Sequence, residues 1–169
     1  MAGDEEAGAC VFQLVESLDA GPVYRSMMVP IGSTTTAGEL LDELARTATP
    51  LVIDTLKDIE AGVEPTPQSV EGVTIAPQIH PGDVRIAVTS AAEEIDHLVR
   101  GASPAPGAWA ELSDKRFKIL RTRCLEAGDR VPSTVATAQP GQLVATRKQL
   151  FLGTGSQPLE LLQVQAFGK

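Results

Sequence analysis

The sequence of 169 residues is poor in aromatic side chains, in cysteine and in histidine. Aromatic residues make up 4% of the chain, so a folded core has to be built mainly from aliphatic side chains. The two cysteines, Cys10 and Cys124, are far apart and form no Cys-x-x-Cys pair, which argues against a zinc site. The two histidines, His80 and His97, also lack the spacing of metal ligands. The composition therefore predicts no bound metal.

Long apolar runs and targeting signals are missing as well. No apolar stretch approaches the ~18 residues that indicate a membrane span. The chain begins with acidic and polar residues, not with the basic and then apolar stretches of a signal peptide. An apolar content of 43% nevertheless indicates a globular protein. We therefore expect a cytoplasmic protein with no membrane partner.

The net charge of −8 is distributed unevenly along the chain. Residues 1–72 hold 3 basic and 13 acidic side chains, whereas residues 73–169 hold 11 basic and 9 acidic ones. Two modules with different partners would explain this asymmetry. Two ordinary solvated surfaces would explain it too, so composition leaves both interpretations open.

The first part of the chain predicts two strands followed by helix. Residues 10–15 and 23–29 are apolar and β-branched, and the Asp, Gly and Pro between them favour a turn in an antiparallel pair. Thr36 and Glu39 have capping-box spacing and predict a helix over 37–47.

Helix signals continue beyond this point. Thr49-Pro50 is typical of a second helix start, and Gly62 is placed to end that helix. Residues 63–87 contain several prolines and no apolar period, which predicts an extended linker. Ser90, with Glu93 three residues later, predicts the N-cap of a further short helix.

Short apolar stretches separated by turn residues fill the rest of the chain, a pattern typical of a small barrel or sandwich. The predicted strands are 108–112, 117–123, 133–138, 143–146, 149–154 and 159–166, with Ser113-Asp114 as one of the turns.

Several short patches then line up in order with one family. The patches are Gly3-Asp4-Glu5, Val11-Phe12-Gln13-Leu14, Leu18-Asp19-Ala20-Gly21-Pro22-Val23, Thr36-Ala37-Gly38-Glu39-Leu40-Leu41, Pro65-Thr66-Pro67-Gln68, Thr74-Ile75-Ala76-Pro77, Pro104-Ala105-Pro106-Gly107-Ala108-Trp109, Leu161-Leu162-Gln163-Val164-Gln165 and Gly168-Lys169. Each patch is weak alone, but the ordered set is specific. The chain resembles the methionyl-tRNA formyltransferase family.

The resemblance implies an enzyme that transfers a formyl group from 10-formyltetrahydrofolate to the methionyl group on initiator tRNA. It implies an α+β chain with a remnant of a Rossmann-like formyltransferase catalytic domain over 1–62, a linker over 63–87, and an OB-like β-barrel that binds tRNA over 88–169. About 130 further residues would be expected in front of such a segment, given the usual domain size. The family also continues beyond Lys169. We therefore expect this chain to be inactive alone.

Asp19 matches the catalytic Asp of the family. A carboxylate there could orient a histidine or a water while the attacking amine loses its proton. The same side chain could instead only organise the turn before Gly21. The resemblance also implies that Leu18, Asp19 and Gly21 contribute to the folate site. The Asn-x-His pair that completes the family's reacting centre has no match in this sequence.

A basic stretch in the rear part provides candidate tRNA contacts. Strand alternation separates Arg116 and Lys118 from Phe117 and Ile119, so the two cations are expected to face outward. The resemblance suggests that these two residues, with Arg121, contact tRNA phosphates. A solubilising strand face is the other interpretation.

A Rossmann sheet without its first strands would expose an edge and an apolar face. We therefore expect residues 10–61 to be loosely packed or to associate with another chain, including a second copy. Two other functions stay open: a non-catalytic tRNA-binding module, and a piece of a sister formyltransferase that acts on a nucleotide sugar or a purine precursor.

Overall fold

The computed structural model describes residues 1–112 and 115–167 and divides into two compact units. The hairpin unit comprises residues 4–32 and 39–78, and the sheet unit comprises residues 1–3, 33–38 and 79 onward. The mixture of helices with antiparallel strands confirms the α+β class. The turn predicted at Ser113-Asp114 and the terminal Gly168-Lys169 lie outside the described residues.

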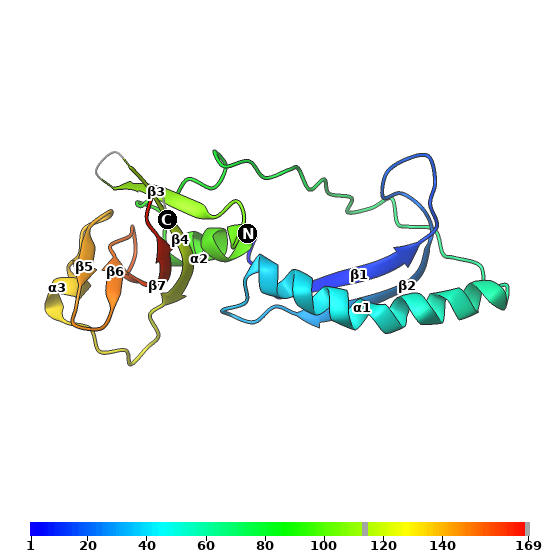
Figure 1. Ribbon diagram of the computed structural model, residues 1–169, viewed down its shortest axis with the longest axis horizontal. Coiled ribbons are helices and arrows are strands. Elements are labelled where there is room, and N and C mark those ends of the chain that lie inside the picture. Colours follow the sequence, from blue (N-terminus) through cyan, green and yellow to red (C-terminus); the bar gives the residue numbers. More distant parts are fainter. Residues whose placement is uncertain (113–114, 168–169) are drawn as a thin grey trace. The chain divides into compact units, whose positions relative to one another are not determined.

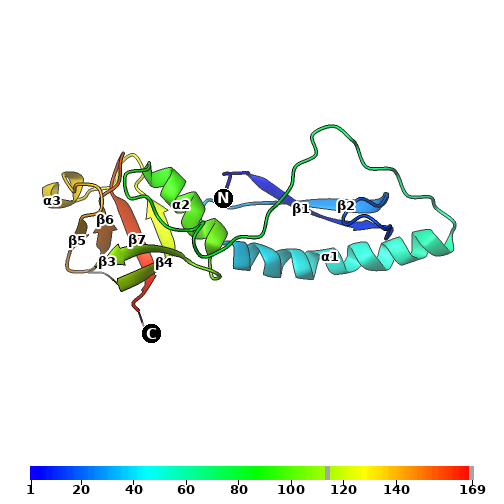
Figure 2. The same cartoon turned by 90° about the horizontal axis from the view of Figure 1, so that it is seen from above.

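The hairpin unit consists of two antiparallel strands and one long helix. Its elements are β1 (Glu6–Phe12), β2 (Val23–Pro30) and α1 (Ala37–Glu60). Within this unit α1 lies alongside the two strands in both views (Figures 1 and 2). The Arg25 side chain forms a bidentate ion pair with Asp58, with 2.9 Å between Nη2 and Oδ1, which ties β2 to α1. The hydrogen bonds from Arg25 hold the pKa of the Asp58 carboxyl below its usual value.

The predicted boundaries of the first strand were wrong. The strand spans Glu6–Phe12 instead of 10–15, because its backbone pairs with β2 from Glu6 opposite Pro30 onward. Backbone pairing depends on the facing strand and extends over Gly8 and the acidic Glu6, which have no strand signature. Leu14 and Val15, which suggested the strand, lie beyond it and are 85% and 48% exposed.

The two predicted helices form one continuous helix, α1, which contains Pro50 in its interior. The Thr49-Pro50 pair was therefore misinterpreted as a helix start. The Thr47 and Thr49 hydroxyls instead donate to the carbonyls of Glu43 and Ala45 in the preceding turn, at 2.8 and 3.2 Å. The predicted end at Gly62 is confirmed, because this glycine has a φ of +76° and its N–H donates to the Ile59 carbonyl.

Apolar side chains of the hairpin unit are largely exposed. Among the described residues of this unit, Val29 is the one buried hydrophobic side chain. Along α1 five large apolar side chains are between 46% and 66% exposed; these are Leu41, Val52, Ile53, Leu56 and Ile59. We call these five residues the apolar face of α1. Three further leucines of α1, Leu40, Leu44 and Leu51, are half-buried. This unit therefore buries little apolar surface by itself.

The sheet unit is a curled five-stranded antiparallel sheet with the strand order β3-β4-β7-β6-β5 and one helix packed on it. Its elements are α2 (Ala92–Ala102), β3 (Ala108–Leu112), β4 (Lys115–Cys124), α3 (Ser133–Ala136), β5 (Leu143–Ala145), β6 (Leu150–Leu152) and β7 (Leu159–Gln165). The pairing of β4 with β7 shifts register on both sides of Arg121. Such irregularities increase strand bending, which accords with the curl of the sheet.

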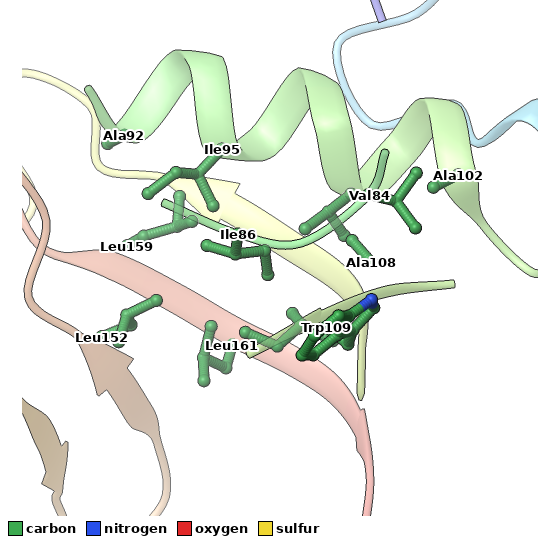
Figure 3. Packing of buried hydrophobic residues seen from close by; sticks show 12 residues of the cluster. Val84, Ile86, Ala92, Ile95, Ala102, Ala108, Trp109, Leu152, Leu159 and Leu161 are labelled. Carbon is green, nitrogen blue, oxygen red and sulfur yellow. The ribbon is translucent and has the colours of Figure 1, made fainter. Parts of the chain in front are cut away.

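The core of the sheet unit lies between α2 and the concave side of the strands (Figure 3). Ile95 and Val99 of α2 meet Ile119 of β4 and Leu159 of β7, and all four are at most 2% exposed. Val84 and Ile86 join the same core, although the sequence placed them in the linker over 63–87. Their segment pairs with β3 because the Ile86 N–H donates to the Trp109 carbonyl at 2.8 Å.

Two further local predictions for this unit were wrong. Residues 133–136 form the short helix α3 and not a strand, because the carbonyl of Pro132 accepts the N–H groups of Val135 and Ala136. The N-cap position of α2 is Ala91 instead of Ser90. The Ala92 N–H donates to Ser156 Oγ at 2.9 Å, so a distant serine satisfies the start of the helix.

The remaining predicted strands are confirmed apart from small changes at their ends. None of the helices within residues 1–112 and 115–167 combines the length and hydropathy that a membrane crossing requires.

Truncation of Leu159 tests the core. Leu159→Ala should lower the free energy of unfolding by about 2–5 kcal/mol, because it leaves a cavity between β7 and α2. Leu162 lies on the same strand and is 48% exposed. Leu162→Ala is the matched control and should change stability by about 0.5 kcal/mol or less. Denaturant unfolding measures both, and equal losses would contradict this description of the core.

Candidate functional site

Residues 13–22, which we call the Asp19 turn, join β1 to β2 in the hairpin unit. Asp19 has a φ of +53° and is the only residue other than glycine with a positive φ in the described part of the chain. This left-handed conformation is uncommon for side chains other than Asp and Asn. Leu18 beside it is 93% exposed. The structure therefore places Leu18 and Asp19 next to each other at the surface of the Asp19 turn.

Gly21 is required by a close approach of the backbone. A Cβ atom at this position would lie 1.6 Å from the Gln13 carbonyl oxygen, so no other residue fits without a shift of the chain. The Gln13 N–H also donates to the Pro22 carbonyl at 2.9 Å. Gly21 is buried, and its lack of a side chain allows the two ends of the turn to lie close together.

The segment that follows α1 binds to this turn. Val23 and Thr66 exchange backbone hydrogen bonds of 2.7 and 2.8 Å as an antiparallel bridge. Two residues later, Gln68 Nε2 donates to the Asp19 carbonyl at 2.9 Å and to the Gly21 carbonyl at 2.7 Å. The turn is thus held from two sides by groups that lie far away in sequence.

An open concavity of about 870 Å³ lies beside the Asp19 turn. Its walls are residues 18–20 and residues 68–76, and Asp19 is the acidic side chain on the first wall. The second wall contributes the exposed apolar side chains Val70, Val73 and Ile75. The surface around Asp19 is therefore mixed: these apolar side chains alternate with polar ones, including a second carboxylate, that of Glu71.

Among the described residues, the lining of the concavity beside Asp19 includes the Glu71 carboxylate and the Ser69 hydroxyl but no histidine or cysteine. His80 and His97 belong to the sheet unit, and the backbone N–H of His80 donates to the Asp83 carboxylate at 2.8 Å. Burial raises the pKa of the Cys124 thiol to about 11, so this thiol stays protonated and unreactive. Cys10 is exposed on β1. No cluster of metal-ligating side chains occurs within residues 1–112 and 115–167.

The candidate tRNA-binding residues Arg116, Lys118 and Arg121 all lie on β4 of the sheet unit. Arg116 is exposed, and its guanidinium stacks on the Trp109 ring at 4.3 Å from the centroid. Lys118 is half-buried and donates to the Pro106 carbonyl at 2.8 Å. Arg121 is also half-buried. The structure therefore presents Arg116 more openly than the other two.

Trp109 organises the surroundings of Arg116. Its Nε1 donates to the Pro81 carbonyl at 2.6 Å. A second guanidinium, that of Arg85, lies 5.5 Å from the ring centroid and pairs with Glu111 at 3.0 Å. The ring face attracts each of the two guanidinium cations, and Glu111 offsets part of their mutual repulsion by pairing with Arg85.

A second cavity, of about 280 Å³, lies in the sheet unit between the two ends of the strand order. One wall comes from β3 and β4 with Ala110, Leu112 and Phe117, and the opposite wall from Leu143 of β5 and Leu152 of β6. The two edge strands of the sheet thus face a common apolar space.

Sequence reasoning missed Gln68 and the role of Trp109. Gln68 stands in the Pro-Thr-Pro-Gln patch, and a polar residue in a stretch without apolar period gives no sign of a partner 47 to 49 residues away. Trp109 is the one tryptophan of the chain. That rarity was the sequence feature that could have marked it as a residue with a specific structural role.

Comparison with known proteins gives a consistent result. A family model described as "Formyl transferase, C-terminal domain" matches residues 78–169. A methionyl-tRNA formyltransferase from Cutibacterium acnes is 88% identical over 169 residues, which cover 100% of this chain and 54% of that protein. One from Streptomyces coelicolor is 43% identical and is covered over 53% of its length. The chain thus spans about half the length of these relatives.

A solved structure of HypX from Aquifex aeolicus in complex with tetrahydrofolic acid has the same fold, with a TM-score of 0.76 and 19% identity. The similarity covers 99% of this chain and 28% of that one. The resemblance to methionyl-tRNA formyltransferases that the sequence patches indicated is confirmed by these relatives. The chain therefore belongs to the formyl transferase family, whose C-terminal domain is formed by residues 78–169.

Proposed function

We propose that the chain is part of an enzyme that transfers the formyl group of 10-formyltetrahydrofolate to the methionyl group on initiator tRNA. The observation that carries this proposal is the 88% identity, over the whole chain, to a methionyl-tRNA formyltransferase. Because the chain spans about half of that relative, the reaction is assigned to the larger protein and not to this segment alone. The tetrahydrofolic acid complex of HypX, a protein of the same fold, supports folate as the formyl carrier.

In this proposal Asp19 is the catalytic carboxylate that the segment contributes. The folate would supply an activated formyl carbon, and the attacking methionyl amine has to lose a proton. The Asp19 carboxylate can hold that proton or orient a neighbouring base, since it lies on the wall of the concavity. Leu18 would contribute an apolar contact beside it. The residues present fit one wall of a site for a flat heteroaromatic ring: exposed apolar side chains with two carboxylate acceptors, Asp19 and Glu71, among them.

The proposed activity is testable in a chimeric protein. In the chimera, this chain replaces the matching half of the Cutibacterium acnes relative. The chimera should formylate methionylated initiator tRNA with 10-formyltetrahydrofolate, whereas the isolated chain should give no turnover. Asp19→Asn should lower kcat at least about 10²-fold, because the amide cannot accept the proton.

Asp42→Asn is the matched control, since Asp42 is an exposed carboxylate on α1 of the same unit. It should leave kcat unchanged. A chimera that formylates an amino sugar nucleotide and not the charged tRNA would support the sister-enzyme function instead. Turnover by the isolated chain would contradict the proposal that the reaction needs the larger protein.

We also propose that the sheet unit is an OB-like barrel that holds the tRNA. The five-stranded order with edges at β3 and β5 supports this proposal, because both edges face the 280 Å³ cavity and a parallel bridge from Arg85 to Trp109 covers part of β3. Arg116 is the leading phosphate contact, with Lys118 and Arg121 beside it on β4. The linker over 63–87 belongs to the same proposal, with its last residues, including Val84 and Ile86, packed into the core of the sheet unit.

Charge reversal at Arg116 tests the tRNA surface. Arg116→Glu should weaken tRNA binding by the isolated chain about tenfold and reduce the slope of log affinity against log salt by about 1, because one phosphate contact is lost. Lys118→Glu should weaken binding less, since this ammonium already donates to Pro106. Arg147→Glu is the matched control on the β5–β6 turn and should bind like the wild type. If all three variants bound tRNA equally well, the proposal that β4 contacts the tRNA would be wrong.

We further propose that the hairpin unit is a remnant of a Rossmann-like catalytic domain, whose missing strands would cover the apolar face of α1. The exposure of this face, at 46–66% for each of its five side chains, supports the proposal. Without those strands, the same face favours association with a second copy.

Sedimentation measures this association. The isolated chain should self-associate in the micromolar range, and Leu56→Glu should shift it toward monomer because a charge enters the apolar face of α1. Phe167→Glu is the control: Phe167 is 71% exposed and belongs to the sheet unit. It should leave the association unchanged. A monomeric wild-type chain at these concentrations would contradict the proposal.

A further inference from the structure

We propose that Gln68 is a positioning residue for Asp19: its side-chain amide fixes the turn that presents the catalytic carboxylate. This inference rests on the proposed function for the role of Asp19. The evidence for the contact itself is the pair of hydrogen bonds of 2.9 and 2.7 Å from Gln68 Nε2 to the Asp19 and Gly21 carbonyls.

The geometry of these two bonds makes Gln68 a clamp. A primary amide nitrogen carries two N–H groups, and here each one meets a different carbonyl. The Asp19 carbonyl belongs to the 19–20 peptide and the Gly21 carbonyl to the 21–22 peptide, so the two bonds hold the peptide planes on either side of the Ala20-Gly21 pair. The orientation of the Asp19 carbonyl is set by the ψ angle of Asp19, and the clamp therefore fixes the backbone from which the carboxylate projects.

Asp19 needs such a clamp because of its own backbone. With a φ of +53° it occupies the left-handed region, which is disfavoured for a residue with a Cβ. Without the amide, the turn can relax to a negative φ, which redirects the side chain. The rest of the turn offers little resistance, since Leu18 and Asp19 are exposed and pack on no core.

The neighbouring bridge keeps Gln68 within reach of the turn. Thr66, two residues earlier, exchanges two backbone hydrogen bonds with Val23. That bridge uses main-chain groups alone, so it survives any substitution of the Gln68 side chain. The clamp and the docking of its segment are therefore separable by experiment.

The experiment uses the chimeric enzyme and a double-mutant cycle. Gln68→Ala and Gln68→Glu should each lower kcat about 10- to 100-fold, as expected for a misplaced catalytic group. The glutamate variant keeps the length of the side chain but has no N–H donor in its ionised form. The KM for the charged tRNA should change less than about twofold. Gln78→Ala is the matched control, an exposed glutamine of the same extended segment, and should leave kcat unchanged.

The cycle separates positioning from mere structural support. In an Asp19→Asn background, Gln68→Ala should lower kcat less than about twofold, because the group it positions is already gone. Hydrogen exchange on the same variants should show faster exchange of the Gln13 amide and unchanged protection of the Val23 amide. Unchanged protection of the Val23 amide would establish that the segment with Thr66 and Gln68 still binds to β2 and that the protein is folded.

Three outcomes would overturn the inference. An unchanged kcat in Gln68→Ala, with Asp19→Asn impaired, would reject the clamp and leave the proposed function standing. An equal loss in both backgrounds would mean that Gln68 acts on something other than Asp19. An Asp19→Asn variant with full activity would reject the catalytic role of Asp19, and with it the positioning role of Gln68.

Discussion

The burial of apolar side chains is concentrated in the sheet unit, and the rest of the structure depends on this imbalance. All twelve residues of the buried cluster defined in the described chain belong to that unit. Burial of this kind contributes roughly 25 cal/mol per Å², so α2 and the curled sheet have a driving force of their own. The hairpin unit has one fully buried apolar side chain, Val29, while others such as Phe12 and Leu44 are half-buried. Backbone pairing and the ion pair of Arg25 with Asp58 hold its elements together. The apolar face of α1 stays exposed because the hairpin unit, residues 4–32 and 39–78, has no further element that packs against it.

The same imbalance explains how the Asp19 turn is held. None of the residues of the buried cluster belongs to it, and main-chain and amide groups hold it: the close approach of Gln13 to Gly21, the Thr66 bridge and the Gln68 clamp. Individual hydrogen bonds of this kind contribute about 1 kcal/mol each. They are directional, however, and a catalytic carboxylate needs a defined orientation more than it needs stability. A polar scaffold can therefore serve a reacting group where a core is absent.

Much of this fold follows from local patterns, and the failures have a common cause. The strands of the sheet unit and the helix end at Gly62 carry signals within a few residues of each other, so they were predictable. The start of β1, the continuous α1 and the helix α3 depend on which segment lies opposite, which a local pattern does not contain. At the candidate site, Asp19 and Gly21 came from the resemblance to a family. Gln68 could not be found, because its partners lie 47 and 49 residues away and are carbonyl groups that every residue possesses.

The basic side chains of β4 differ in how much of their binding capacity is already used. The Lys118 ammonium group has three N–H donors, and one of them donates to the Pro106 carbonyl. The Arg116 guanidinium carbon lies over the Trp109 ring at 4.3 Å from the centroid, and the group carries five N–H donors in a planar fork. This contact with the ring restricts a long side chain before any ligand arrives, which reduces the entropy lost on binding. Arg116 therefore combines a restricted position with donors that suit a phosphate, and a solubilising role would require neither property.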